Sequence, residues 1–399
     1  MSSLIVDAHQ DLAWNAAAFG RDYTQSALTR RAQEAATDSL ARKILGQTML
    51  GLPDYLRGRI AVIFGTLFAS PKRKQSGEWE ERVCYRDAQE AHRIYQQELD
   101  YYHRLADECP RFRLIGDQRD LEAVLATWEG PETPPDLDPP DQDPPDQDPP
   151  DIDPPDIDPH APKPLPGPAH AQVGLVPLME GADGIREPRE AEAWMERGLR
   201  IVGLAWTGTR YAGGTREPGP LTPEGRRLVK TMSDLGLMLD LAHSSDESWF
   251  EALDLFEGVV MCTHANPRAL LRNPAAPERH PTDAMIRRLA ERGGVVGVVP
   301  YNRFLKADWR DGDNRADVPL IRVADAIDYI CQLTGSAAHV GLGTDFDGGF
   351  GAETAPEGLD TIADLPKIGD LLRERGFSAL DVQAVLAENW LGVLRRGLP

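Results

Sequence analysis

Leu4-Ile5-Val6-Asp7-Ala8-His9-Gln10-Asp11 is an apolar run that ends in two side chains able to bind a metal ion. Side chains two positions apart on a strand point to the same face of a sheet, so His9 and Asp11 can contact one cation. Imidazole and carboxylate are both suitable ligands for zinc. A single H-x-D pattern is common by chance, so its meaning depends on further ligands along the chain.

Three further apolar runs are each followed by a carboxylate or a histidine. Glu180 follows Val176-Pro177-Leu178-Met179, His243 follows the run 237–242, and His264 follows the run 259–263. Taken singly, Glu180 could be a surface residue that opens a loop, and each histidine could be a hydrogen-bonded core residue. Four strand-like runs that all end in good ligand types favour one shared metal site over four coincidences.

Apolar runs of strand length alternate with amphipathic helical stretches along the chain. The expected strands are Leu4–His9, Ile60–Ala69, Val173–Met179, Ile201–Trp206, Leu237–Ala242, Val259–Cys262, Val295–Val299 and Val340–Gly343. The expected helices are Arg86–Cys109, Glu190–Arg197, Pro223–Leu235, Glu247–Phe256, Asp283–Glu291 and Val323–Leu333. Strands that are apolar throughout are typical of a parallel sheet buried on both faces. About eight strand–helix repeats predict an α/β fold, the (β/α)8 TIM-type barrel, with its active site at the carboxyl ends of the strands.

A doubly wound α/β sheet is the alternative fold. Such sheets usually bind nucleotides through a G-x-G-x-x-G or G-x-x-x-x-G-K-[ST] motif, and the chain has neither. The barrel is therefore the preferred prediction.

The segment 133–168 differs from the rest of the chain. It contains ten Asp and one Lys, and Asp-Pro-Pro-Asp recurs in it with a period of five residues. Proline and mutually repelling carboxylates oppose burial, so we expect an extended, solvated insertion. A docking ligand for a proline-binding domain is the other interpretation. Because expected metal ligands lie on both sides of the segment, residues 1–399 are predicted to form one barrel domain with this low-complexity Asp/Pro insertion within it.

Composition excludes several classes of function. The net charge of −21 argues against binding to nucleic acid, which needs a basic surface. No apolar run approaches the length of a membrane span, so no membrane partner is expected. The four cysteines are scattered, without a C-x-x-C pair, which suits reduced thiols and a cytoplasmic location.

A glycine-rich stretch follows the last expected strand: Gly341-Leu342-Gly343-Thr344-Asp345-Phe346-Asp347-Gly348-Gly349. Asp345 would project from the end of a late strand, where a barrel hydrolase places a catalytic acid. The alternative is a simple turn or a fragment of a calcium loop. The EF-hand pattern fails, because no glutamate follows at the required offset.

Taken together, these motifs resemble the membrane (renal) dipeptidase family, peptidase family M19, the zinc dipeptidases of the amidohydrolase-like barrels. The resemblance covers nearly the whole chain apart from the Asp/Pro segment. It implies two zinc ions, one held by His9 and Asp11 and one by His243 and His264, with Glu180 between them. It also implies that a hydroxide shared by the zincs attacks the peptide carbonyl. Asp345 matches the catalytic acid of the family.

The resemblance assigns two further positions near the expected site to substrate binding. Arg279 in Arg279-His280-Pro281-Thr282-Asp283 matches the family arginine that binds the substrate carboxylate, although His280 replaces an Asn; Arg272 is a competing match. Trp206 stands where the family has a substrate-binding histidine. An indole N–H donates one hydrogen bond but neither accepts a proton nor binds metal, so we expect Trp206 to alter substrate preference.

The predicted function is therefore metal-dependent hydrolysis of small dipeptides, including those with a C-terminal D-residue. The alternatives are another barrel amidohydrolase, such as a lactonase or an N-acyl amino acid hydrolase, and a non-catalytic relative that binds small molecules. Asp7 and Asp240 are candidate acceptors for the N–H groups of the ligand histidines, or else ordinary buried aspartates. A homodimer is an open prediction, since no surface stripe requires one.

Overall fold

The computed structural model describes residues 4–129 and 168–399. Most of the predicted Asp/Pro insertion (133–168) thus lies outside the described residues. The chain enters and leaves that segment at adjacent points, because the indole N–H of Trp128 donates to the carbonyl oxygen of Gln172 over 2.7 Å. The backbone N–H of Gln172 in turn donates to Thr127 Oγ1 over 2.9 Å.

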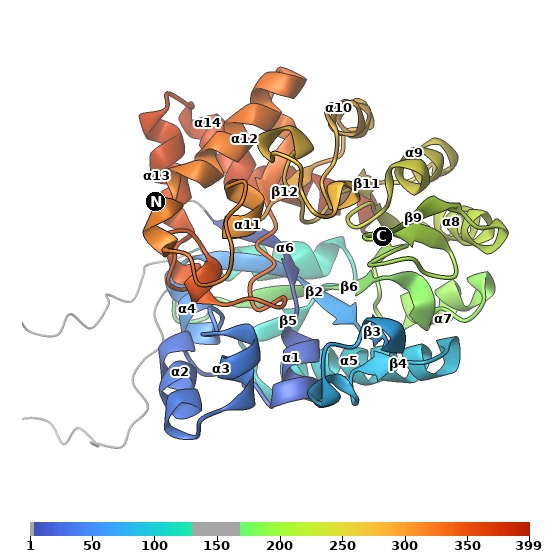
Figure 1. Cartoon of the computed structure of the whole chain (residues 1–399), viewed down its shortest axis with the longest axis horizontal. Coiled ribbons are helices and arrows are strands. Elements are labelled where there is room, and N and C mark those ends of the chain that lie inside the picture. The colour runs from blue at the N-terminus through green and yellow to red at the C-terminus, as the bar shows by residue number, and fades with distance from the viewer. Residues whose placement is uncertain (1–3, 130–167) are drawn as a thin grey trace, which may run out of the picture.

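Parallel strands form a closed barrel in the centre of the described chain (Figure 1). They are β1 (Ile5–Gln10), β2 (Ile60–Phe68), β6 (Val173–Glu180), β7 (Ile201–Gly203), β10 (Met238–Asp240), β11 (Val260–Met261), β12 (Val296–Val298) and β13 (Val340–Leu342). Their order is β11-β10-β7-β6-β2-β1-β13-β12. A parallel bridge from Cys262 to Val296 joins the two ends of this path and closes the barrel. The barrel prediction is confirmed.

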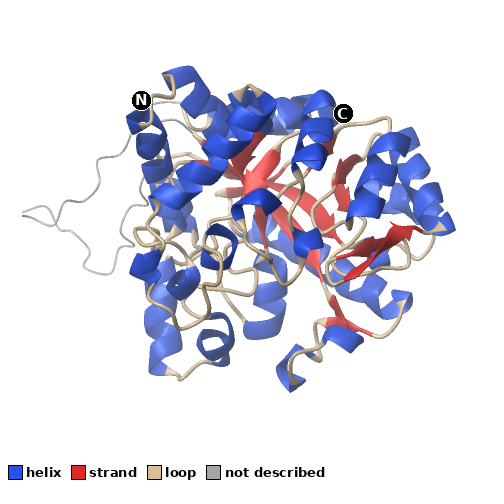
Figure 2. Ribbon diagram, turned by 45° about the horizontal axis from the view of Figure 1, so that its top comes forward, coloured by secondary structure: helices blue, strands red, loops and turns tan. Residues whose placement is uncertain are grey.

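Helices surround the strands on the outside (Figure 2). Those predicted are α5 (Ala88–Glu108), α7 (Ala191–Glu196), α8 (Pro223–Leu235), α9 (Asp246–Leu255), α10 (Asp283–Glu291) and α12 (Ile321–Thr334). The others are α1 (Leu12–Phe19), α2 (Ala27–Ala36), α3 (Leu40–Leu45), α4 (Leu52–Arg57), α6 (Gln118–Ala126), α11 (Asn302–Leu305), α13 (Pro366–Glu374), α14 (Ala379–Gln383) and α15 (Asn389–Gly397). No helix among residues 4–129 and 168–399 is both long and apolar enough to cross a membrane.

Local sequence explains where these elements begin and end. Every residue of β2 and β6 is buried, as their mostly apolar sequences predict; the polar exceptions are Thr66 and the terminal Glu180. Helix α8 begins where Thr222 accepts the N–H of Gly225, with Pro223 in its first turn. Helix α10 begins with the same arrangement, Thr282 accepting the N–H of Met285.

Two small additions lie at the carboxyl ends of the barrel strands. β3 (Ser70–Pro71) and β4 (Cys84–Tyr85) pair in the segment after β2. β8 (Ala212–Gly214) and β9 (Glu217–Leu221) form an antiparallel hairpin in the segment after β7. A further strand, β5 (Phe112–Leu114), pairs with β6 outside the barrel path. The first two additions bring side chains to the mouth of the barrel.

Candidate functional site

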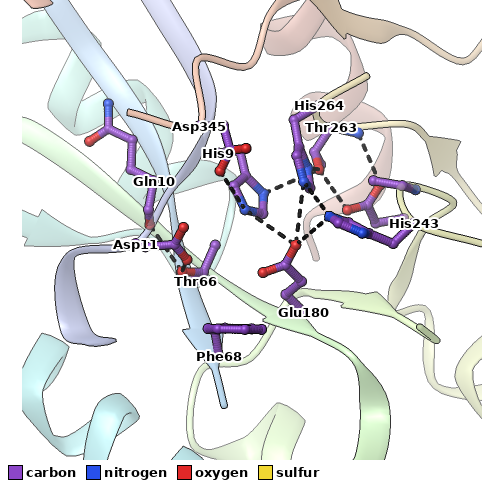
Figure 3. A network of polar contacts seen from close by, with 12 residues as sticks. His9, Gln10, Asp11, Thr66, Phe68, Glu180, His243, Thr263, His264 and Asp345 are labelled. Carbon is purple, nitrogen blue, oxygen red and sulfur yellow. Dashed lines mark hydrogen bonds and ion pairs between the residues drawn. The ribbon is translucent and has the colours of Figure 1, made fainter. Parts of the chain in front are cut away.

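The structure brings the five predicted ligand residues together at the carboxyl end of the barrel (Figure 3). His9 is in β1, with Asp11 just after that strand, and Glu180 is the last residue of β6. His243 follows β10, and His264 follows β11. The side chains thus come from four strands and meet where a barrel places its chemistry.

Glu180 lies at the centre of the cluster. Its Oε1 is 3.1 Å from His243 Nε2, 3.3 Å from His264 Nε2 and 3.6 Å from His9 Nε2. The Nε2 atoms of His243 and His264 are only 3.0 Å apart. The rings of His9 and His264 stack with their centroids 3.5 Å apart. Three imidazole nitrogens therefore converge on one carboxylate oxygen.

Thr263 fixes which nitrogen of His264 faces the cluster. Its hydroxyl donates its single hydrogen to Asp240 Oδ2 over 2.6 Å. Toward His264 Nδ1, 2.9 Å away, the same hydroxyl oxygen can only accept. The proton of His264 is therefore on Nδ1, and the Nε2 lone pair points into the cluster. His9 Nδ1 lies 3.4 Å from the same hydroxyl, so one threonine orients two rings.

The hydrogen bonds of Asp7 and Asp240 agree with the second interpretation, that of buried, hydrogen-bonded aspartates, rather than with direct contacts to the imidazoles. Asp7 accepts hydrogen bonds from the side chain of Gln10 and from the backbone N–H and hydroxyl of Thr344, which follows β13. Asp240 accepts from Thr263 and from the backbone N–H of Ala242, and so acts on His264 only through Thr263. Between Asp240 and His264, the hydroxyl of Thr263 is the relay.

Two more threonines take part that the sequence interpretation missed. Thr215, in the turn between β8 and β9, lies with its hydroxyl 2.9 Å from His243 Nδ1. Thr66 in β2 donates to Asp11 Oδ1. A lone hydroxyl in the apolar strand Ile60–Phe68 is a signal that could have identified Thr66. Nothing in the sequence identifies Thr215, because its contact depends on how the hairpin folds back.

Two residues of the site have a left-handed backbone. His243 has φ 63° and Asp345 has φ 57°. Residues other than glycine rarely adopt a positive φ, and those that do cluster at functional sites. The neighbouring Asp347 also has φ 63°, and it accepts from Tyr23 and from the backbone of Met49. Asp347 therefore holds the loop in place, and Asp345 is left facing the cluster.

Asp345 and Arg279 lie at the open side of the cluster. Asp345 Oδ1 is 4.0 Å from His9 Nε2, and its Oδ2 is 4.0 Å from an Nη of Arg279. Arg279 is 6% exposed, donates to the carbonyl oxygen of His264 over 2.7 Å, and stacks over Phe304 at 5.1 Å. The competing Arg272 is exposed at the rim of the same cavity. The geometry favours Arg279 as the residue that faces a bound ligand.

The histidines and carboxylates change one another's protonation. Burial lowers the pKa of His9, but Glu180, Asp11 and Asp345 outweigh it and raise that pKa to about 9. Burial, together with the positive charge of Arg279, lowers the pKa of His243 to about 4. Burial raises the pKa of Asp11 to about 6, despite the opposing effect of His9. The carboxylates thus attract positive charge into a region where most of the imidazoles stay neutral.

The residues fit a metal ion on the evidence of their own atoms. His9 Nε2 is fully buried and has no hydrogen-bond partner among the described residues. One set of ligand atoms within 4.8 Å of one another belongs to His9, Glu180 and His264, and a second set to His9, Asp11 and Asp345. Buried imidazole nitrogens and carboxylate oxygens that converge at such distances are the ligand types that a zinc ion takes.

The cluster lies at the bottom of a cavity of about 790 Å³. Its lining includes Asp11, Glu180, His243, Arg279 and Asp345. Trp206 also lines it, with its ring 5.0 Å from Phe68 and 6.3 Å from His243. The cavity is of the size that binds small-molecule ligands.

The fold is a parallel α/β barrel, and imidazoles and carboxylates cluster at the carboxyl ends of its strands. These are the features of a metal-dependent hydrolase. Comparison with known proteins identifies the family. The model of the membrane dipeptidase family, peptidase family M19, matches residues 168–397, more than half of the chain. The chain belongs to this family and is a metallodipeptidase of it.

The chain is also similar in sequence to curated proteins. The chain is 33% identical over 233 residues to an uncharacterized protein in the pqqA 5′ region of Klebsiella pneumoniae, covering 56% of this chain and 82% of that protein. It is 31% identical over 204 residues to the dipeptidase aclJ of Aspergillus oryzae, covering 50% of this chain and 45% of that one.

Solved structures show the same fold over the full chain. A metallopeptidase from Rhodobacter sphaeroides, crystallised with a phosphinate mimic of the dipeptide L-Ala-D-Ala, superposes with a TM-score of 0.71 at 21% identity, covering 100% of both chains. The dipeptidase AC, a metallopeptidase of family M19, also gives a TM-score of 0.71 at 21% identity, over 100% of this chain and 99% of the other. The resemblance inferred from the sequence motifs is confirmed.

Proposed function

We propose that this protein is a binuclear zinc dipeptidase that hydrolyses small dipeptides, including those with a D-residue at the C-terminus. The observation that carries the proposal is the position of Glu180, whose Oε1 lies within 3.6 Å of three imidazole Nε2 atoms. A carboxylate in this position is suited to link two metal ions. The Rhodobacter sphaeroides structure, with its L-Ala-D-Ala mimic, supports the dipeptide substrate.

The ligand sets proposed here are those that the family resemblance implies. His9 and Asp11, from β1, would hold one zinc, and His243 and His264 the other, with Glu180 between them. Thr263 and Thr215 hold the rings of His264 and His243 with their Nε2 atoms toward Glu180, where they would be able to bind zinc. When bound, the two ions supply Lewis acidity, which makes water a nucleophile near neutral pH and polarises the carbonyl.

The chain's own residues complete the reaction. Asp345 takes a proton from the attacking water and delivers it to the nitrogen of the leaving amine, so that the C–N bond breaks as water adds. Burial raises the pKa of Asp345 well above its usual value, against the opposing effect of His9, and so favours proton uptake. Arg279 binds the free carboxylate of the substrate through two N–H donors. Its buried position keeps that contact away from bulk water.

Metal analysis together with a dipeptide panel tests the proposal. Purified protein should contain close to two zinc equivalents and hydrolyse members of L-Xaa-D-Ala and L-Xaa-Gly series. Normal metal content with no turnover of any dipeptide would shift the assignment to a lactonase, an N-acyl amino acid hydrolase or a non-catalytic binding relative. The homodimer and the cytoplasmic location stay predictions, for which size-exclusion chromatography with light scattering and cell fractionation are the measurements.

A further inference from the structure

Four aromatic side chains form one wall of the cavity, and the proposed mechanism does not use them. Trp14 is in α1, Phe68 ends β2, Trp79 lies in the 3-10 turn Glu78–Glu80, and Trp206 follows β7. All four line the cavity above the metal-ligand cluster. We call them the aromatic wall.

The wall is a continuous series of ring contacts that starts at the cluster. Trp206 lies 6.3 Å from the ring of His243, and Phe68 meets Trp206 edge-on at 5.0 Å. Trp14 then contacts Phe68 at 6.0 Å and Trp79 at 5.8 Å, both edge-on. Such edge-to-face pairs are the favoured arrangement of aromatic rings. The series therefore runs from a proposed metal ligand, His243, to Trp79 in the segment between β3 and β4.

Trp79 is held by the loop that carries it. Glu80 is 6% exposed, and it accepts from the backbone and hydroxyl of Ser76, over 2.7 and 3.0 Å, and from the hydroxyl of Ser70 in β3. A Cβ on Gly77 would come within 2.7 Å of the Trp79 ring, so glycine there lets the indole lie against its own loop. Phe19 stacks on Trp79 at 5.2 Å. The wall is thus built into the fold.

The barrel places the wall opposite Arg279. In the strand order β11-β10-β7-β6-β2-β1-β13-β12, closed by the bridge between Cys262 and Val296, β2 lies across the barrel from β11. Arg279 belongs to the segment after β11, and Phe68 ends β2. Figure 3 shows Phe68 beyond Glu180, on the far side from His264. The metal-ligand cluster therefore lies between the arginine and the wall.

This arrangement sets the direction of a bound dipeptide. A substrate whose carboxylate contacts Arg279 and whose peptide carbonyl lies over the cluster must extend its amino-side residue toward β2. There it meets Trp14, Phe68, Trp79 and Trp206, with Leu45 and Ile44 beside them. Trp14 and Phe68 are already buried, whereas Trp79 and Trp206 are partly exposed. A small side chain would leave the exposed parts of Trp79 and Trp206 facing water, whereas a large apolar one would remove apolar surface on both partners from water.

We infer that the aromatic wall selects dipeptides with a large apolar or aromatic residue on the amino side of the scissile bond. The inference rests on the proposed function and narrows its substrate class. In this inference, Trp79 and Trp206 determine which residue is accepted on the amino side of the scissile bond. Arg279 binds the carboxylate at the C-terminus of the dipeptide. A hydrophobic pocket already separates substrates that differ by one methylene about 10- to 200-fold, so selection by whole rings should be readily measurable.

The test compares kcat/KM for L-Trp-D-Ala and L-Phe-D-Ala with that for L-Ala-D-Ala, using the zinc-loaded full chain. We expect the aromatic substrates to be preferred at least about tenfold. Trp79→Ala should reduce that ratio most of the way to one, whereas Trp79→Phe should retain most of it. Thermal melting of both variants checks that they fold.

Trp309 provides the matched control. It lines the same cavity but belongs to the segment after β12, beside the Arg279 side of the barrel. Trp309→Ala should leave the ratio between the aromatic substrates and L-Ala-D-Ala as it is in the wild type. Equal kcat/KM for the three dipeptides, or an equal fall of the ratio in both alanine variants, overturns the inference but leaves the dipeptidase proposal standing. Absence of turnover on every dipeptide overturns the proposed function, and the inference with it.

Discussion

Replacing Thr263 by valine tests whether this hydroxyl positions the metal ligands. Valine has nearly the same shape, so the change removes only the polar group. It leaves the Nδ1 proton of His264 without its acceptor at 2.9 Å and Asp240 without the O–H donor at 2.6 Å. Both groups are buried, 0% and 1% exposed.

The expected cost follows from these two contacts. A buried donor left without an acceptor costs about 1–3 kcal/mol, and a hydrogen bond to a charged group contributes about 1.5–3 kcal/mol. Asp240 keeps the backbone N–H groups of Ala242 and Thr263, so we expect the lower part of the summed range, a loss of about 2.5–4 kcal/mol in the free energy of unfolding of the metal-free protein. Loss of an orienting partner should also weaken zinc binding about 10- to 100-fold.

Two measurements check this prediction. Urea denaturation of the metal-free protein gives the stability, and competition with a zinc-binding indicator gives the affinity. Thr263→Ser retains the hydroxyl and should recover most of the zinc affinity. A Thr263→Val protein that binds zinc within about twofold of the wild type would refute the relay from Asp240 through Thr263 to His264.

Three further changes test the proposed roles of the site residues and of the metal. Asp345→Asn should lower kcat by about 10²–10⁴ while zinc content, measured by atomic emission, stays near two equivalents, because an amide cannot carry the proton; retained activity would contradict the proposed role. Arg279→Lys should raise KM for dipeptides more than it lowers kcat, because an ammonium cannot reproduce the planar two-donor contact. Steady-state kinetics on free and C-terminally amidated dipeptides measure this effect. The substitution should change the kinetics of the amidated dipeptides little. Removing zinc with a chelator should lower the melting temperature, since a ligand present at 100 times its Kd stabilises the folded state by about 2.7 kcal/mol; calorimetry that finds no shift would argue against a bound metal.

The barrel was predictable because its strands carry a strong and local signal. Each predicted strand is present, and α8 and α10 have the predicted bounds Pro223–Leu235 and Asp283–Glu291. The carboxyl ends of the strands were predicted less accurately. The predicted strand Ile201–Trp206, for example, ends at Gly203 in the structure. There the chain leaves the ladder to bring Trp206 into the cavity, while its sequence stays apolar.

What could not be predicted depends on contacts between distant segments. Thr215 reaches His243 only because the β8–β9 hairpin folds back, with Gly214 bridging Ser244. The positive φ of His243 and Asp345 could not be predicted either, because aspartate and histidine adopt this conformation more often than most side chains but still uncommonly. The predicted ligand residues could be found from the sequence because each directly follows or ends an apolar strand. Their hydrogen-bond partners have no such marker.

The neighbouring positions of Trp128 and Gln172 have a consequence for engineering this protein. The indole-to-carbonyl contact closes the point where the chain departs at residue 129 and returns at 168, near the amino end of β6. That end of the barrel is opposite the catalytic mouth. A reporter domain or an affinity handle could therefore be spliced between these two residues, or the intervening stretch trimmed to a short linker, and turnover of a test peptide should be unaffected.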